Sequence, residues 1–93
     1  MKNQYFGDVT DYIKYGVLRH LIRAGFNLGV HWTLTPDDES TDGSRTTYLT
    51  RHREWRHYDP EIYDAISRHV NAGRRSLSVV EEERFLPEAF FLP

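Results

Sequence analysis

One short alternating segment, residues 28–34, most limits the folds that this chain can adopt. Side chains alternate between the two faces of a strand, so the sequence LGVHWTL places its large apolar residues on one face: Leu28, Val30, Trp32 and Leu34. Segments with helical apolar spacing come before and after it. This order predicts an α/β fold with one clear strand and about three helices.

The first helix is expected over residues 9–24. Asp8 is a suitable N-cap, and Gly25 is a natural left-handed stop. Apolar residues recur every four positions, which predicts a core-facing stripe: Val9, Ile13, Val17 and Leu21. Trp32 is therefore expected to be buried against this helix.

The second helix is expected over residues 60–72, because Asp59 can cap it and Pro60 suits its first position. A short third helix should begin at Ser78, whose hydroxyl would form a capping box with Glu81. Residues 46–49 fit a short strand and a helical turn equally well.

The composition limits the function classes. A chain of 93 residues with 39% apolar and 14% aromatic residues can form one small domain, residues 1–93. The net charge of −2 gives no global attraction to nucleic acid or anionic membranes. Cysteine is absent, which excludes disulfides, thiolate nucleophiles and cysteine-bound zinc. No apolar run resembles a signal peptide or a membrane span, so we expect a cytoplasmic protein without membrane contact.

An acidic loop follows the predicted strand. It offers Asp37, Asp38 and Asp42 as candidate metal ligands, since Mg²⁺ prefers carboxylate oxygens and water. A metal-dependent nuclease would need these acids to converge. The alternative is a solvated surface loop, because Asp, Ser and Gly are also ordinary turn residues.

A basic segment, residues 51–58, alternates cations with aromatic rings. Arg51, Arg53 and Arg56 could contact phosphates while Trp55 stacks on bases or packs on a partner. The alternative is an amphipathic connector whose aromatic rings enter the core.

The sequence closes with an apolar tail that contains Phe90, Phe91 and Leu92. Exposed apolar patches of this kind often mark interfaces. We expect the tail to pack against another protein chain, to mediate self-association, or to add as an edge strand.

Four segments resemble an uncharacterised bacterial protein family. They are NQYFGDVTDYIKYGVL at residues 3–18, LGVHWTLTPDD at 28–38, DG at 42–43 and YDPE at 58–61. Members of that family are typically longer, and their later half has a strand that ends in an Asp-Pro-Asp-Asn-Gly type motif. Nothing similar occurs here, so the chain resembles the N-terminal part of the family.

The spacing of Gly7, Asp11 and Lys14 is also distantly similar to the opening of the rRNA adenine-N6 methyltransferases. That resemblance implies a small, partial Rossmann-like domain in which Asp11 and Lys14 lie at an S-adenosylmethionine site. The methyltransferases have a glycine-rich turn after their first strand, whereas this chain has Thr35-Pro36-Asp37. Their Asp-Pro-Pro-Tyr type motif is absent as well. We therefore expect no cofactor for this chain alone, although a complete family member could use S-adenosylmethionine or Mg²⁺.

Three functions follow from these patterns. The leading expectation is a nucleic-acid-related, methyltransferase-like domain that is incomplete and not catalytic alone. The second is a small stand-alone binding or inhibitor protein of the phage or mobile-element type. The third is a nuclease that uses the acidic loop.

Overall fold

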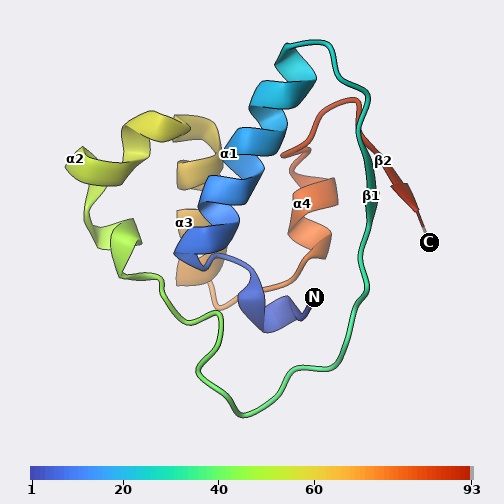
Figure 1. Cartoon of the computed structure of the whole chain (residues 1–93). Helices are drawn as coiled ribbons and strands as arrows, with labels where there is room; N and C mark the ends of the chain where they lie inside the picture. Colours follow the sequence, from blue (N-terminus) through green and yellow to red (C-terminus); the bar gives the residue numbers. More distant parts are fainter. Residues whose placement is uncertain (93) are drawn as a thin grey trace.

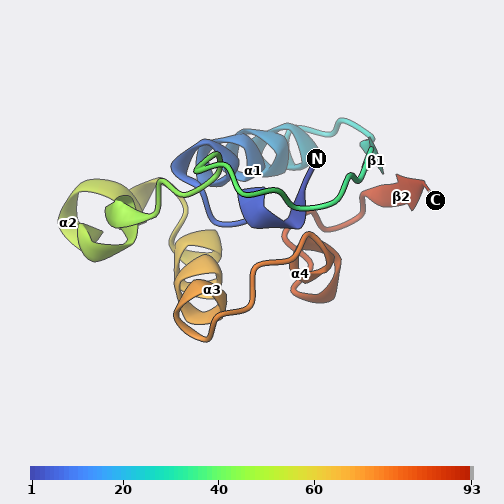
Figure 2. The same ribbon diagram turned by 90° about the horizontal axis from the view of Figure 1, so that it is seen from below.

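A computed structural model describes residues 1–92 of the chain, with only the backbone described at Leu92. The molecule is flat, with extents of 35 × 34 × 18 Å. Helix α1 forms one layer, and helices α3 and α4 form the other (Figure 2). The two strands lie at one end, and helix α2 lies at the opposite end (Figure 1).

The elements follow the chain in this order: 3₁₀ helix η1 (Asn3–Tyr5), α1 (Val9–Arg23), β1 (Gly29–His31), 3₁₀ helix η2 (Thr47–Thr50), α2 (His52–Trp55), 3₁₀ helix η3 (Arg56–Tyr58), α3 (Pro60–Asn71), α4 (Ser78–Glu82) and β2 (Phe90–Leu92). The chain is therefore a mixed α/β domain, as predicted. Residues 47–50 form a helical turn, which settles the choice left open between a strand and a turn.

The sheet has two parallel strands rather than the one strand expected. Strand β2 comes from the apolar tail and pairs with β1, Gly29 opposite Phe90 and Val30 opposite Phe91. Strand β1 is shorter than the predicted segment. The residues that follow it bond to the N-terminus of the chain instead of to β2. The Met1 ammonium donates to the Thr33 carbonyl at 2.6 Å, and the Thr35 N–H donates to the Met1 carbonyl at 2.8 Å.

Two of the three expected caps form. The Asp8 carboxylate accepts the Thr10 N–H at 2.9 Å, and the Asp59 carboxylate accepts the Ile62 N–H at 3.3 Å. These caps begin α1 and α3 at the predicted residues. The capping box expected at Ser78 is wrong, because the N-cap of α4 is Leu77 and no side chain caps it.

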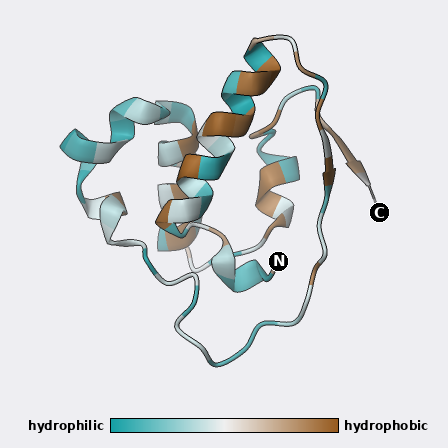
Figure 3. Ribbon diagram, in the orientation of Figure 1, coloured by the Kyte–Doolittle hydropathy of each residue, from teal (hydrophilic) through white to brown (hydrophobic). Residues whose placement is uncertain are grey.

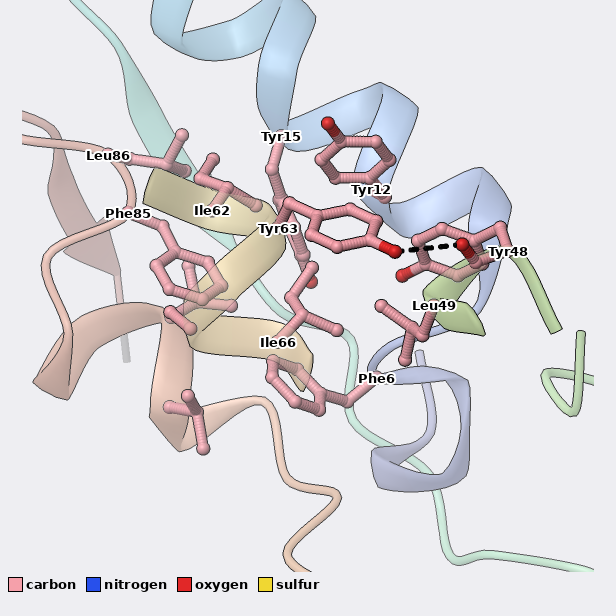
Figure 4. Packing of buried hydrophobic residues seen from close by; sticks show 13 residues of the cluster. Phe6, Tyr12, Tyr15, Tyr48, Leu49, Ile62, Tyr63, Ile66, Phe85 and Leu86 are labelled. Atoms are coloured by element: carbon pink, nitrogen blue, oxygen red, sulfur yellow. Dashed lines mark hydrogen bonds between the residues drawn. The ribbon is translucent and has the colours of Figure 1, made fainter. Parts of the chain in front are cut away.

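An aromatic core joins the two helical layers (Figure 4). Its tyrosines bury their rings and direct their hydroxyls to hydrogen-bond acceptors, which are backbone carbonyls for all of them except Tyr15. Tyr63 donates to the Tyr48 carbonyl at 2.9 Å, and Tyr48 donates to the Gly7 carbonyl at 2.8 Å. The largest fully buried side chains of the core are those of Phe6, Tyr12, Tyr15, Ile62, Tyr63, Ile66 and Val80.

The apolar stripe predicted for α1 faces the core only in part, because Val9 packs against the core and the middle of the stripe does not. Ile13 and Val17 are 52% and 55% exposed, whereas Tyr12, Tyr15 and Arg19 are buried. Each of these three larger side chains has a specific polar partner inside the molecule, which offsets part of the cost of burying its polar group. The prediction that the apolar stripe of α1 covers Trp32 is thus partly wrong, since Val17 is exposed.

Trp32 packs instead against the apolar tail. It is partly buried, and its ring stacks on that of Phe91 with 6.3 Å between centroids. Hydropathy differs between the two ends of the molecule, with apolar strands at one end and a polar α2 at the other (Figure 3). In residues 1–92, no helix is long and apolar enough to cross a membrane.

Candidate functional site

A polar cleft of about 570 Å³ lies between the start of α1 and the loop at residues 41–45. The start of α1 contributes Asp8, Asp11 and Lys14, and the loop contributes Ser44 and Arg45. Asp11 and Lys14 are three residues apart on one helix, so their side chains lie on the same face. The structure thus places both of the residues singled out by sequence in one cleft.

Asp11 is one of two buried acids of this cleft, and like Asp8 it has 4% of its surface exposed. One carboxylate oxygen lies 3.4 Å from the Lys14 Nζ, and the other accepts the Tyr15 hydroxyl at 3.4 Å. Burial raises the pKa of Asp11, and the nearby Lys14 opposes this shift only in part. Both contacts are long for a charged group, so the carboxylate retains capacity to accept a further donor.

Asp8 has the opposite balance. Burial raises its pKa, but hydrogen bonds from the backbone N–H groups of Thr10 and Arg45 outweigh that effect, and the net pKa of Asp8 is lowered. The Arg45 guanidinium donates to the Thr10 hydroxyl at 2.9 Å and lies 3.5 Å from the Asp8 carboxylate. Arg45 thereby supplies a second cation to the cleft.

The position of this loop depends on Gly43 and Arg75. Gly43 has a φ of +82°, and a Cβ there would lie 2.7 Å from the Gln4 carbonyl oxygen. The Arg75 guanidinium donates to the Phe6 carbonyl at 2.7 Å and also to the Gly43 carbonyl. Sequence analysis missed this role, because Arg75 and Gly43 lie far apart in the chain and no local pattern links them.

The cleft combines buried and exposed charges of both signs. Three carboxylates, one lysine and one arginine line it, together with the hydroxyls of Thr10, Thr41 and Ser44. A ligand with both an ammonium and an anionic group would find partners here. The ammonium would suit Asp11, and the anionic group would suit the exposed Arg45 and half-exposed Lys14.

The acidic loop is engaged in structural hydrogen bonds. Asp37 accepts the Gln4 N–H at 3.0 Å, and Asp38 accepts the Ser40 N–H and the Gln4 side-chain amide. Bonds from Ser40 lower the pKa of Asp38. Asp42 lines the polar cleft, and its backbone carbonyl accepts the Gln4 side-chain amide. In residues 1–92, no three His, Cys, Asp or Glu side chains gather in an arrangement that could hold a metal ion.

The basic segment divides into paired and unpaired cations. Arg56 forms a bidentate pair with Asp64 at 2.9 and 2.8 Å, and Arg51 lies 3.8 Å from Glu54. Arg53 is exposed and has no carboxylate within 4 Å among the described residues. Trp55 is half-buried and packs edge-on against Tyr48, as the connector interpretation expected, but Tyr58, which that interpretation also placed in the core, is exposed.

The tail residues differ from one another. Phe90 is 58% exposed, and its ring covers Gly29, where a Cβ would lie 2.7 Å from the Phe90 ring. Phe91 faces the core and stacks on Trp32. The side chain of Leu92 lies outside the described part of the chain. The tail is thus an edge strand of this domain, which was one of the expected outcomes.

Comparison with known proteins gives no further guide, since no family model, curated protein or solved structure matches the chain.

Proposed function

We propose that this chain is a nucleic-acid-related, methyltransferase-like domain that is not catalytic alone. The observation that carries the proposal is the buried carboxylate of Asp11, which lies 3.4 Å from the Lys14 Nζ and lines a polar cleft. These are the two residues that the resemblance to rRNA adenine-N6 methyltransferases assigns to a cofactor site. Keeping a buried acid with only long contacts is costly to stability, and groups of this kind concentrate at functional sites.

The parallel pairing of β1 and β2 gives further support. Parallel strands need a crossover connection, and here the connection contains helices α2, α3 and α4. Strands linked in this way are the building unit of Rossmann-like domains. We propose that this chain has a partial version of that architecture.

The environment of β1 supports the view that the chain does not bind S-adenosylmethionine alone. In open α/β sheets, ligands bind outside the carboxyl ends of the strands. That position after β1 is taken by the chain itself, because Met1 bonds to Thr33 and Thr35, and Gln4 bonds to Asp37. The segment also has no glycine-rich turn.

Two measurements test the proposal. Fluorescence anisotropy with labelled RNA and DNA should show binding. The logarithm of the binding constant should fall linearly with the logarithm of the salt concentration, as phosphate contacts require. Calorimetry with S-adenosylmethionine should show no binding. A chain that binds no nucleic acid would refute the nucleic-acid part. Micromolar cofactor binding that Lys14→Ala abolishes would refute the non-catalytic part.

A second candidate function is protein binding, and the exposed ring of Phe90 favours it. Parallel sheets are normally covered on both faces. Here Val30 and Phe91 pack against the core, while Gly29, His31 and Phe90 leave the opposite face open. Binding of another chain at this face would cover the exposed apolar surface.

A further inference from the structure

An apolar groove of about 540 Å³ separates α1 from the segment that contains α2 and η3. Helix α1 contributes Ile13, Gly16 and Val17 to its wall, and the opposite wall contains Trp55 and Tyr58. Tyr58 is 69% exposed, and Ile13 and Val17 are more than half exposed. The groove is thus an open apolar surface of the size that holds small aromatic ligands.

Aromatic rings line one side of this groove. The centroids of Trp55 and Tyr58 lie 6.0 Å apart, and the ring of His57 lies 4.1 Å from that of Tyr58. Bases of single-stranded nucleic acids stack on aromatic platforms of this kind. A base in a duplex is already stacked and paired, so an unpaired base is the form that can enter the groove.

Three exposed side chains on or next to the groove walls can donate hydrogen bonds to phosphate: His20 lines the groove, and Arg53 and His57 belong to the segment that forms its opposite wall. Arg53, His20 and His57 are exposed, and none lies within 4 Å of a carboxylate in residues 1–92. The nearby acids are already paired. Asp59 and Glu61 bind Arg19, at 3.1 and 2.9 Å respectively.

From this geometry we infer that the groove binds single-stranded nucleic acid. A base occupies the space above Gly16 and stacks on Tyr58, while the neighbouring phosphates lie near Arg53 and His57. This inference rests on the proposed function and adds a binding site to it. The site is separate from the polar cleft and uses the exposed face of α1, which the core does not need.

Gly16 provides the sharpest test because it can be enlarged without strain. A Cβ at this position meets no atom within 4 Å, and glycine is a poor residue inside a helix. Gly16→Leu should therefore fill the groove while the unfolding midpoint stays equal or rises. A loss of binding in this variant cannot be attributed to unfolding.

The experiment measures anisotropy of short labelled single-stranded oligonucleotides with the full chain. Gly16→Leu and Tyr58→Ala should each weaken binding by about 5- to 150-fold, the range for loss of one stacked base. Arg53→Ala should weaken binding. It should also reduce the slope of the log binding constant against log salt concentration by about 1. Arg74→Ala is the matched control, since Arg74 is exposed in the loop beyond the far end of α3.

The outcomes separate this inference from the proposed function. Binding that is unchanged in Gly16→Leu and Tyr58→Ala would overturn the groove site and leave nucleic-acid binding elsewhere on the chain intact. Equal affinity for duplex and single strands would also overturn the groove site. Absence of nucleic-acid binding by the unmodified chain would overturn both proposals.

Discussion

The Tyr12 hydroxyl accepts the backbone N–H of Asp59 at 2.9 Å, and this bond joins the start of α3 to the first turn of α1. The same hydroxyl donates to the Trp55 carbonyl at 2.7 Å. One phenol therefore holds both ends of the segment that forms a wall of the apolar groove. Because Tyr12 is only 2% exposed, water cannot replace these bonds readily.

Tyr12→Phe should remove both bonds and leave a buried N–H and a buried carbonyl without partners. The expected loss is about 1–3 kcal/mol in the free energy of unfolding, measured by urea titration. Tyr5→Phe is the control, because the Tyr5 hydroxyl makes no hydrogen bond among residues 1–92. A Tyr12→Phe chain as stable as the control would show that the two bonds contribute little.

Arg19 forms the second link between the helical layers. Its guanidinium is buried and binds the buried Asp59 as well as the exposed Glu61. Arg19→Met should cost about 3–5 kcal/mol, because it leaves the Asp59 carboxylate buried without its counter-charge. Glu61→Gln should leave the unfolding midpoint nearly unchanged. Equal effects of the two substitutions would contradict this assignment.

Asp11→Asn should stabilise the fold at neutral pH. Burial raises the pKa of Asp11 above its ordinary value of 3.8, so ionisation is less favourable in the folded chain than in the unfolded chain. The stability linked to this group is full below 3.8 and is lost as the pH rises through the raised pKa. The advantage of Asp11→Asn should therefore be largest at pH 7 and disappear at acid pH.

Lys14→Met supplies the matching control for this pH dependence. Lys14 lowers the pKa of Asp11, so its removal should reduce stability at neutral pH. The same substitution should have a much smaller effect when Asp11→Asn is already present. Urea midpoints of the four chains across the pH range measure this coupling. Additive effects would show that the two side chains act independently.

Phe90→Glu tests the protein-binding candidate. Since the ring is 58% exposed, the substitution should leave the helices folded while it dissociates any oligomer or complex formed at this face. Phe91→Glu is expected to destabilise the fold as well, because Phe91 stacks on Trp32. Sedimentation and circular dichroism distinguish the two results. A chain that is monomeric at high concentration before any substitution would argue against self-association.

Features that depend on interactions within one helical turn could be predicted from the sequence, and features that depend on contacts between distant segments could not. The caps Asp8 and Asp59 act within one helical turn, and they predicted the beginnings of α1 and α3 correctly. The buried face of α1 was not predicted, because hydropathy favours Ile13 and Val17 over tyrosine and arginine. Tyr12 and Arg19 are buried through bonds to Asp59, which lies far along the chain.

The same distinction applies to the candidate site. Asp11 and Lys14 are one turn apart, so their shared face could be predicted from spacing alone. Arg45 and Arg75 reach the cleft region from distant segments, through bonds to Thr10 and Gly43 respectively. Nothing local in their surroundings indicates these partners.

The parallel register of Gly29 with Phe90 also has a kinetic consequence. Residues 32–89 separate the two strands, and contacts of such long range form late because their loop-closure entropy is high. During synthesis, β1 emerges long before β2 is available to pair with it. Its unpaired edge is therefore open to other strands in that interval, and aggregation during translation, rather than instability of the finished fold, is the hazard that this topology creates.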